Sequence, residues 1–436
     1  MGFNRKKLIC TFKKIFYYMD QYAAILLWAI PSFLVLVIIE IVYGHLTNKQ
    51  TYTLMDTLAS LSSGMTNILK DSLKLVVILI SYPFVLKSLA VIELESSLSL
   101  YFIAFVCIDF ASYWNHKLNH KINIFWNLHI IHHSSEEFNL ACALRQSISS
   151  LLGFGALFLI PAAILGVPHE IIIVLAPLHL FGQFWYHTRH IGKLGWLEYI
   201  LVTPSQHRVH HAINPIYIDK NLSAIFCVWD RIFGTFQEEL DNETPVYGVL
   251  KPVNSWNPIW INFQHAWAIA CDAWYAKSWV DKLRVWFMPT GWRPTDVAER
   301  FPRDIIENVH NLEKYNPQYT LSQKAIGLFH FISVNLLLLY FLSNFAELNI
   351  QFRIFLGGII FISIFSYTSL MDLHSWAIKF QVLWSCIGLL IIWLPNLQGY
   401  FMSQNFLQIG LSLYFTVSLI LTYWSITSVS SQTQSV

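Results

Sequence analysis

Long apolar stretches separated by short polar ones dominate both ends of the chain. A membrane-spanning helix needs about 17 to 25 predominantly apolar residues, and the pattern predicts about nine such spans. They are expected at residues 21–43, 73–92, 97–115, 147–167, 170–187, 327–346, 352–370, 377–396 and 405–425. The predicted fold class is therefore all-α, a polytopic membrane helical bundle.

The longest segment without a predicted span is residues 188–325, which is polar and rich in Trp and Pro. Two spans joined by the short turn at 166–169 precede it, a hairpin that returns the chain to the face it left. The pattern thus predicts an N-terminal membrane anchor region at 1–95, a central domain with a polar cap at 96–325, and a C-terminal four-helix transmembrane region at 326–436.

Composition excludes a soluble chain. Hydrophobic residues make up 55% of the sequence and charged residues 12%, whereas about a quarter of the residues in soluble proteins are charged. The formal net charge of +2 is too small to indicate nucleic acid as a partner. The six cysteines are scattered without a C-x-x-C pair, which is typical of buried packing residues rather than of a disulfide framework.

Basic residues indicate the orientation in the membrane. Lys and Arg crowd the polar segments between residues 117 and 324, which favours the cytoplasm for that face. Residues 5–14 are basic as well, so either one of the first three spans is re-entrant or interfacial, or the N-terminus faces the other side. The amphipathic residues 52–72 are expected along the membrane interface. The membrane would be the endoplasmic reticulum in a eukaryote and the inner membrane in a bacterium.

Histidines recur at helical spacing in three boxes, H-x3-H, H-x2-H-H and H-x2-H-H. The boxes contain His116, His120, His129, His132, His133, His207, His210 and His211. Residues at i and i+4 of a helix share one face, so each box can direct its imidazoles at one volume. His187, in F-W-Y-H-T after the fifth predicted span, returns to the same face and is a ninth candidate ligand. The other histidines are expected to be ordinary packing or surface residues.

The donor set of the boxes indicates the kind of metal. Structural zinc takes four ligands, commonly with thiolates, whereas redox iron with open positions uses imidazole and carboxylate. Eight imidazoles without a nearby thiolate are too many for one zinc and suit two metal ions.

Four charged residues near the boxes are candidates for a catalytic role. Asp109, seven residues before His116, lies in an apolar span, where a charged group is usually partnered. It is expected to orient a ligand histidine; the alternative is an aspartate that caps or pairs inside the bundle. Glu136 and Glu137 follow the second box directly and are candidates to accept hydrogen bonds from its histidines or to bind the metal; the alternative is that they face solvent. Arg145 is expected to pair with one of these glutamates or with an anionic head group.

Further stretches surround the boxes in the same order along the chain: F-W-Y-H-T, T-P-S-Q-H-R-V-H-H, Y-I-D-K-N and W-D-R-I-F-G-T-F. Together with the boxes they resemble the fatty acid hydroxylase/sterol desaturase superfamily of membrane di-iron oxygenases. The segments 246–258 and 289–294, and the extra C-terminal spans, resemble the alkylglycerol monooxygenase family within it. The resemblance implies a fatty acid hydroxylase-type di-iron catalytic domain at 96–325, with its histidine-rich cap on the cytoplasmic face.

The resemblance also implies an activity. Members of that family use dioxygen and tetrahydrobiopterin to hydroxylate the carbon beside the ether oxygen of an O-alkylglycerol, which then releases a fatty aldehyde. The implied cofactors are two irons, held by the box histidines, and tetrahydrobiopterin; the partners are a lipid substrate, dioxygen and an electron donor. The family pattern has an acidic residue after the second histidine of the first box, where this chain has Lys121, so the donor stays open between a pterin and a redox protein.

Two alternatives remain open at this point. One is a related di-iron hydroxylase or desaturase that acts on a sterol, a fatty acyl chain or an amino-acid lipid. The other is a non-catalytic lipid carrier built on the same bundle, against which the intact histidine boxes argue.

Overall fold

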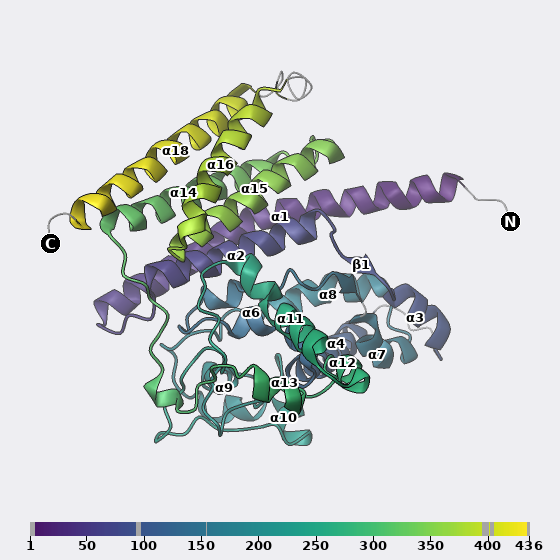
Figure 1. Ribbon diagram of the computed structural model, residues 1–436. Helices are drawn as coiled ribbons and strands as arrows, with labels where there is room; N and C mark the ends of the chain where they lie inside the picture. Colours follow the sequence, from purple (N-terminus) through teal and green to yellow (C-terminus); the bar gives the residue numbers. More distant parts are fainter. Residues whose placement is uncertain (1–4, 93–96, 154, 395–400, 402–404, 434–436) are drawn as a thin grey trace.

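Six long apolar helices form the framework of the molecule. The computed structural model describes residues 5–92, 97–153, 155–394, 401 and 405–433. Within this part of the chain, six helices are long and apolar enough to cross a membrane. They are α1 (Arg5–Leu46), α4 (Leu98–Lys121), α14 (Leu321–Ser343), α15 (Ile350–Met371), α16 (Ser375–Ile392) and α18 (Asn405–Thr433). The last four pack together as one bundle, and α1 lies beside α14 (Figure 1).

Three of the nine predicted spans are absent as single long helices. Residues 73–92 form strand β1 (Val77–Ile78) and helix α3 (Tyr82–Leu89). Residues 147–187 form strand β2 (Leu152–Gly153), η2 (Gly155–Leu159), α7 (Ile160–Ile164) and α8 (His169–Phe181), with β1 and β2 paired in parallel. Pro83 and Pro161 lie at the second position of α3 and α7, and Gly166 turns between α7 and α8 with φ +67°. Proline and glycine break these apolar stretches into pieces that pack on α4 and on one another.

Helix α2 (Leu54–Ser72) is buried, contrary to the expectation that residues 52–72 lie along the interface. It packs against α14, α15 and α11 (Pro258–Tyr275). Its inner face includes Ser60, Ser63 and Thr66, which are fully buried. The amphipathic pattern is real, but its polar side faces protein partners rather than water.

Short helices make up the part that carries the histidines. They are α5 (Asn123–Trp126), α6 (Ile130–His133), η1 (Cys142–Leu144), η3 (Gly195–Tyr199), α9 (Pro204–His210), α10 (Val228–Ile232), α12 (Trp279–Arg284), α13 (Thr295–Arg300) and η4 (Val309–Asn311). They lie below the C-terminal bundle in Figure 1. Loops between them allow residues far apart in sequence to meet at the C-terminal end of α4.

Candidate metal centre

Each box lies on a helical stretch at this end of the molecule. His116 and His120 lie on α4, His129, His132 and His133 at α6, and His207, His210 and His211 at α9. Three separate helices therefore bring the boxes together, as the i, i+4 spacing predicts.

The structure sorts nine histidines into two groups whose candidate ligand atoms lie within 4.8 Å of one another in each group. The first histidine group is His116, His120, His129, His133 and His210. The second histidine group is His132, His187, His207 and His211. The Nε2 atoms of His116 and His129 are 2.8 Å apart, as are those of His187 and His207. All nine candidate ligands of the sequence analysis, His187 included, belong to a group.

One short loop orients three members of the first histidine group. The carbonyl of Leu222 accepts from His116 Nδ1 at 2.8 Å, and the carbonyl of Lys220 accepts from His210 Nδ1 at 3.0 Å. Asp219 Oδ1 accepts from His120 Nδ1 at 3.2 Å. Each of these contacts fixes the tautomer that carries the proton on Nδ1 and leaves the Nε2 lone pair directed at the group.

The same loop, residues 219–222, has two residues with positive φ, and hydrogen bonds to neighbouring segments stabilise it. Asp219 and Asn221 have φ values of +59° and +51°, a region that Asp and Asn tolerate better than other side chains. Asn221 Nδ2 donates to the carbonyls of Gln206 and Gln237, and Asp230 accepts from the Leu222 N–H at 2.7 Å. The Y-I-D-K-N motif therefore positions a carboxylate and a carbonyl oxygen to accept hydrogen bonds from candidate ligand histidines.

Backbone carbonyls also orient the second histidine group. His132 Nδ1 donates to the carbonyl of Arg145 at 3.3 Å, and His187 Nδ1 donates to that of Gln183 at 3.0 Å. The Nε2 atom of His211 then lies 3.0 Å from Nε2 of His132. In each group, the histidines whose Nδ1 meets a carbonyl or carboxylate carry the proton there, which leaves Nε2 as their ligand atom.

The electrostatics of the site fit a bound cation. Burial, together with neighbouring imidazoles, lowers the pKa of His133 and His211 well below its usual value. Burial lowers the pKa of His187 to about 4. Neutral imidazoles are the form that binds metals. Among the described residues, His133 Nε2 and His210 Nε2 are buried without a hydrogen-bond partner, and a buried lone pair without a partner is costly unless a metal takes it.

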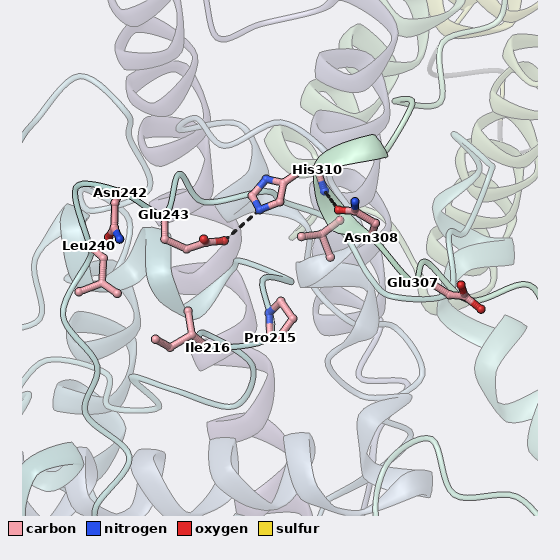
Figure 2. A pocket seen from close by; sticks show the side chains of 9 residues that line it. Pro215, Ile216, Leu240, Asn242, Glu243, Glu307, Asn308 and His310 are labelled. Carbon is pink, nitrogen blue, oxygen red and sulfur yellow. Dashed lines mark hydrogen bonds and ion pairs between the residues drawn. The ribbon is translucent and has the colours of Figure 1, made fainter.

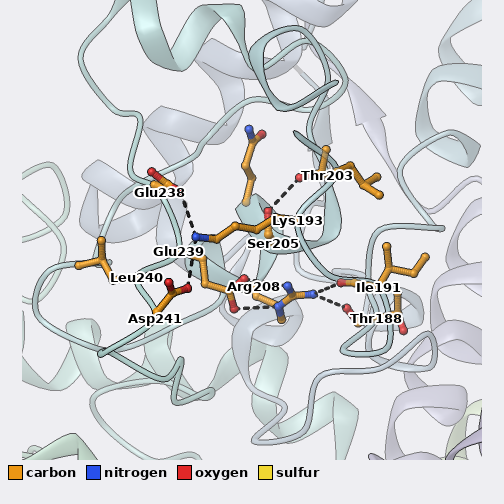
Figure 3. Close-up of polar contacts among 12 residues, drawn as sticks. Thr188, Ile191, Lys193, Thr203, Ser205, Arg208, Glu238, Glu239, Leu240 and Asp241 are labelled. Atoms are coloured by element: carbon orange, nitrogen blue, oxygen red, sulfur yellow. Dashed lines mark hydrogen bonds and ion pairs between the residues drawn. The ribbon is translucent and has the colours of Figure 1, made fainter. Parts of the chain in front are cut away.

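Arg208 ties the helix of the third box to the segment that follows His187. Its guanidinium donates to both oxygens of Glu239, at 2.9 and 2.7 Å, and to the carbonyls of Thr188 and Ile191 (Figure 3). Lys193 pairs with Glu238 and Asp241 beside it. Bidentate Arg–carboxylate pairs are geometrically specific, so this contact sets how α9 meets the chain near His187.

Asp109 does not orient a box histidine, contrary to expectation. Its carboxylate accepts from His179 Nε2 at 2.7 Å, from Trp229 Nε1 at 2.9 Å, and from the N–H groups of Ile225 and Phe226. Seven residues of helix separate it from His116 by about 10 Å, which is too far for a hydrogen bond. Asp109 joins α4 to α8 and to residues 225–229.

Glu136, Glu137 and Arg145 also have other partners than those expected. Glu136 accepts from the N–H of Tyr315, and Glu137 pairs with Lys314 at 2.7 Å. Both glutamates thus contact residues 314–315. These partners lie far away in the sequence, so the sequence did not predict them. Arg145 is buried and pairs with Asp56 of α2 at 2.6 Å rather than with a glutamate. Arg145 nevertheless reaches the site, because its carbonyl orients His132.

Three acidic residues near the site were not among the predicted site residues: Glu40, Asp56 and Asp219. Glu40, on α1, is buried and accepts from Thr188 Oγ1, Tyr52 OH and the Leu140 N–H. An ionisable residue inside an apolar run is usually partnered. The position of Glu40 in the run 21–43 could therefore have predicted that it has buried partners.

Lys121 pairs with the same carboxylate that holds His120. Its Nζ lies 2.7 Å from Asp219 Oδ2, and the lysine side chain is half exposed. Burial raises the pKa of Asp219, but hydrogen bonds from His120 and Lys121 outweigh it and lower that pKa overall. Lys121 therefore contacts the same carboxylate that orients His120, a candidate ligand.

A surface cavity of about 420 Å³ lies apart from both histidine groups (Figure 2). Nine residues line it, including Pro215, Ile216, Leu240 and Glu243, and His310 pairs with Glu243 at 3.2 Å. None of the nine candidate ligands lines this cavity, so it is separate from the metal centre.

Comparisons with known proteins agree with the geometry. A fatty acid hydroxylase family model matches residues 101–235, which include every candidate ligand. No solved structure matches the chain.

Three alkylglycerol monooxygenases are similar over most of their length. The chain is 35% identical to that of Xenopus tropicalis over 69% of this chain and 67% of the relative. It is 35% identical to that of Homo sapiens over 73% of this chain and 71% of the relative. It is 32% identical to that of Danio rerio over 93% of this chain and 89% of the relative. The chain therefore belongs to the alkylglycerol monooxygenase family of membrane lipid monooxygenases.

Proposed function

We propose that the protein is an iron-dependent monooxygenase that hydroxylates O-alkylglycerols beside the ether oxygen, with one iron in each histidine group. The observation that supports this most directly is the convergence of nine histidines into two groups, within each of which the candidate ligand atoms lie within 4.8 Å of one another. The names of the similar proteins support the substrate class.

Bound iron would supply the activation of dioxygen needed to insert one oxygen atom into an unactivated C–H bond. The other oxygen atom leaves as water, with two electrons from a tetrahydropterin. The hydroxylated ether is a hemiacetal and separates into a fatty aldehyde and a glycerol derivative.

The chain's own residues hold the centre rigid and dry. Carbonyls of residues 145, 183, 220 and 222 keep the proton of four histidines on Nδ1. Phe138 is fully buried beside His187 and His211 and covers the second histidine group with an apolar wall. Exclusion of water strengthens each electrostatic contact in the site and limits side reactions.

The centre is proposed to face the cytoplasm, because basic residues gather on the segments around the boxes. The lipid would reach it from the membrane with its alkyl chain still in an apolar environment.

Purified protein should contain about two irons per chain and release fatty aldehyde from an O-alkylglycerol when dioxygen and tetrahydrobiopterin are present. Iron is measured by elemental analysis and aldehyde by mass spectrometry. Removal of iron with a chelator should abolish aldehyde formation, and added iron should restore it.

The result can contradict the proposal in two distinct ways. Protein without iron would exclude the enzyme and favour a lipid carrier. Protein with iron but no aldehyde, with the pterin or with a reducing protein, would instead favour hydroxylation of another lipid class.

Asp219→Asn should weaken iron binding by about 10- to 100-fold, as is typical when an outer partner of a metal-bound histidine is lost. Asparagine keeps the left-handed backbone of Asp219 available and removes the negative charge that faces His120 and Lys121. Competition with a chelator measures the change. Asp241→Asn, at an exposed carboxylate, is the matched control, and equal iron affinity in both variants would contradict the role of Asp219.

A further inference from the structure

Helix α11 presents a wholly aromatic outer face. Its exposed residues are Trp260, Phe263, Trp267, Trp274 and Tyr275. Trp267 is 65% exposed and Trp274 78%. Single exposed apolar residues are common on soluble proteins, but a continuous aromatic stripe marks an interaction surface.

The polar side of α11 faces the protein instead. Asn262 is fully buried and accepts from the Ile148 N–H at 2.9 Å. Asp272 is buried and pairs with Arg293 at 3.0 Å and Arg303 at 2.8 Å. A helix on a water-exposed surface has the opposite arrangement, with apolar residues inward and polar residues outward. The environment outside α11 is therefore apolar.

Contacts place α11 at the level where two spans end. Its N-cap residue Asn257 donates to Ser369 Oγ at 2.8 Å, near the C-terminal end of α15. Farther along, His265 donates to the carbonyl of Asn123, two residues after the end of α4. A helix that connects the ends of two spans lies at the boundary of the membrane rather than across it.

The aromatic face continues onto α12. Trp279 is 78% exposed, and Leu283 and Phe287 are exposed beside it. Exposed Lys277 and Arg284 flank these residues. Trp beside Lys and Arg is the combination found where a protein meets lipid head groups, because the indole occupies the boundary and the cation meets the phosphate.

We propose that the aromatic surface of α11 and α12 lies in the head-group region of the same bilayer that the spans cross. The bilayer is favoured over a protein partner by continuity with the ends of α4 and α15 and by the flanking cations. This surface gives the histidine-bearing part of the molecule a second contact with the membrane, beside the ends of α4 and α15. The inference does not depend on the metal or on the substrate.

The test measures what surrounds this surface in the full-length protein. Trp267→Cys and Leu283→Cys, each in a background with Cys10→Ser, Cys271→Ser and Cys386→Ser, are labelled with a fluorophore and placed in phospholipid nanodiscs. Quenching by a lipid nitroxide near the head group should be several-fold stronger than quenching at Asp241→Cys, an exposed polar site. Aqueous iodide should quench the Asp241→Cys label most strongly.

Leu413→Cys, on the exposed side of α18, is the control for the bilayer interior and should respond best to a nitroxide deep in the acyl chains. Labels at residues 267 and 283 that respond to iodide alone would overturn the proposal, since the surface would then face water. Labels protected from both quenchers would also overturn it and would indicate a second copy or another protein on this face.

Discussion

His132→Ala and His133→Ala should each lose about one iron per chain, but from different sites, together with more than about 100-fold of the activity. The two histidines are neighbours in sequence, yet His132 belongs to the second histidine group and His133 to the first. Loss of a ligand costs more than loss of its outer partner, which alone is typically worth 10- to 100-fold in affinity. Mössbauer spectra of the two variants should therefore show different residual irons.

His265→Gln is the matched control, because His265 is largely buried near the site but belongs to neither group and donates to the carbonyl of Asn123. It should retain the iron of the unmodified protein. Identical residual spectra for His132→Ala and His133→Ala would contradict a division into two sites, and full iron in either variant would remove that residue from the centre.

Helical spacing was sufficient to predict which histidines of one box share a helix face. Residues at i and i+4 share a face, so the convergence of His207 with His211 follows from local geometry. Spacing also makes neighbours such as His132 and His133 diverge by about 100°, but which of them joins which group depends on how α6 meets α4 and α9. Those are tertiary contacts between helices, and the sequence of a single box does not predict them.

Partners of buried charges were harder to predict for the same reason. The sequence indicated that Asp109 must be partnered because it lies in an apolar span. Its partners include Ile225 and Phe226, more than a hundred residues away, and their backbone N–H groups carry no signature in the sequence. Arg145 likewise pairs with Asp56 of a helix that amphipathicity alone placed at the interface.

Apolar length predicted membrane spans well at the C-terminal end and poorly in the middle. Residues 73–92 and 147–187 form short pieces that pack on α4 and on each other, while other apolar side chains in them, such as Phe84 and Val174, stay exposed. The hydropathy of a segment indicates that its side chains avoid water, but it does not tell whether lipid or protein surrounds them. Pro83, Pro161 and Gly166 were the local signals that these stretches are not continuous helices.

Asp109→Ala should lower the free energy of unfolding by about 3 to 5 kcal/mol, the usual range when one partner of a buried charged network is removed. The carboxylate is fully buried, and its loss leaves His179, Trp229 and two backbone N–H groups without an acceptor. Because Asp109 touches no candidate ligand, the variant that still folds should keep its iron while its thermal unfolding in detergent shifts to lower temperature. Asp109→Asn should be intermediate, since the amide oxygen still accepts, and the exposed Asp241→Asn should unfold like the unmodified protein. Iron loss at temperatures well below unfolding would instead give Asp109 a direct role at the metal centre.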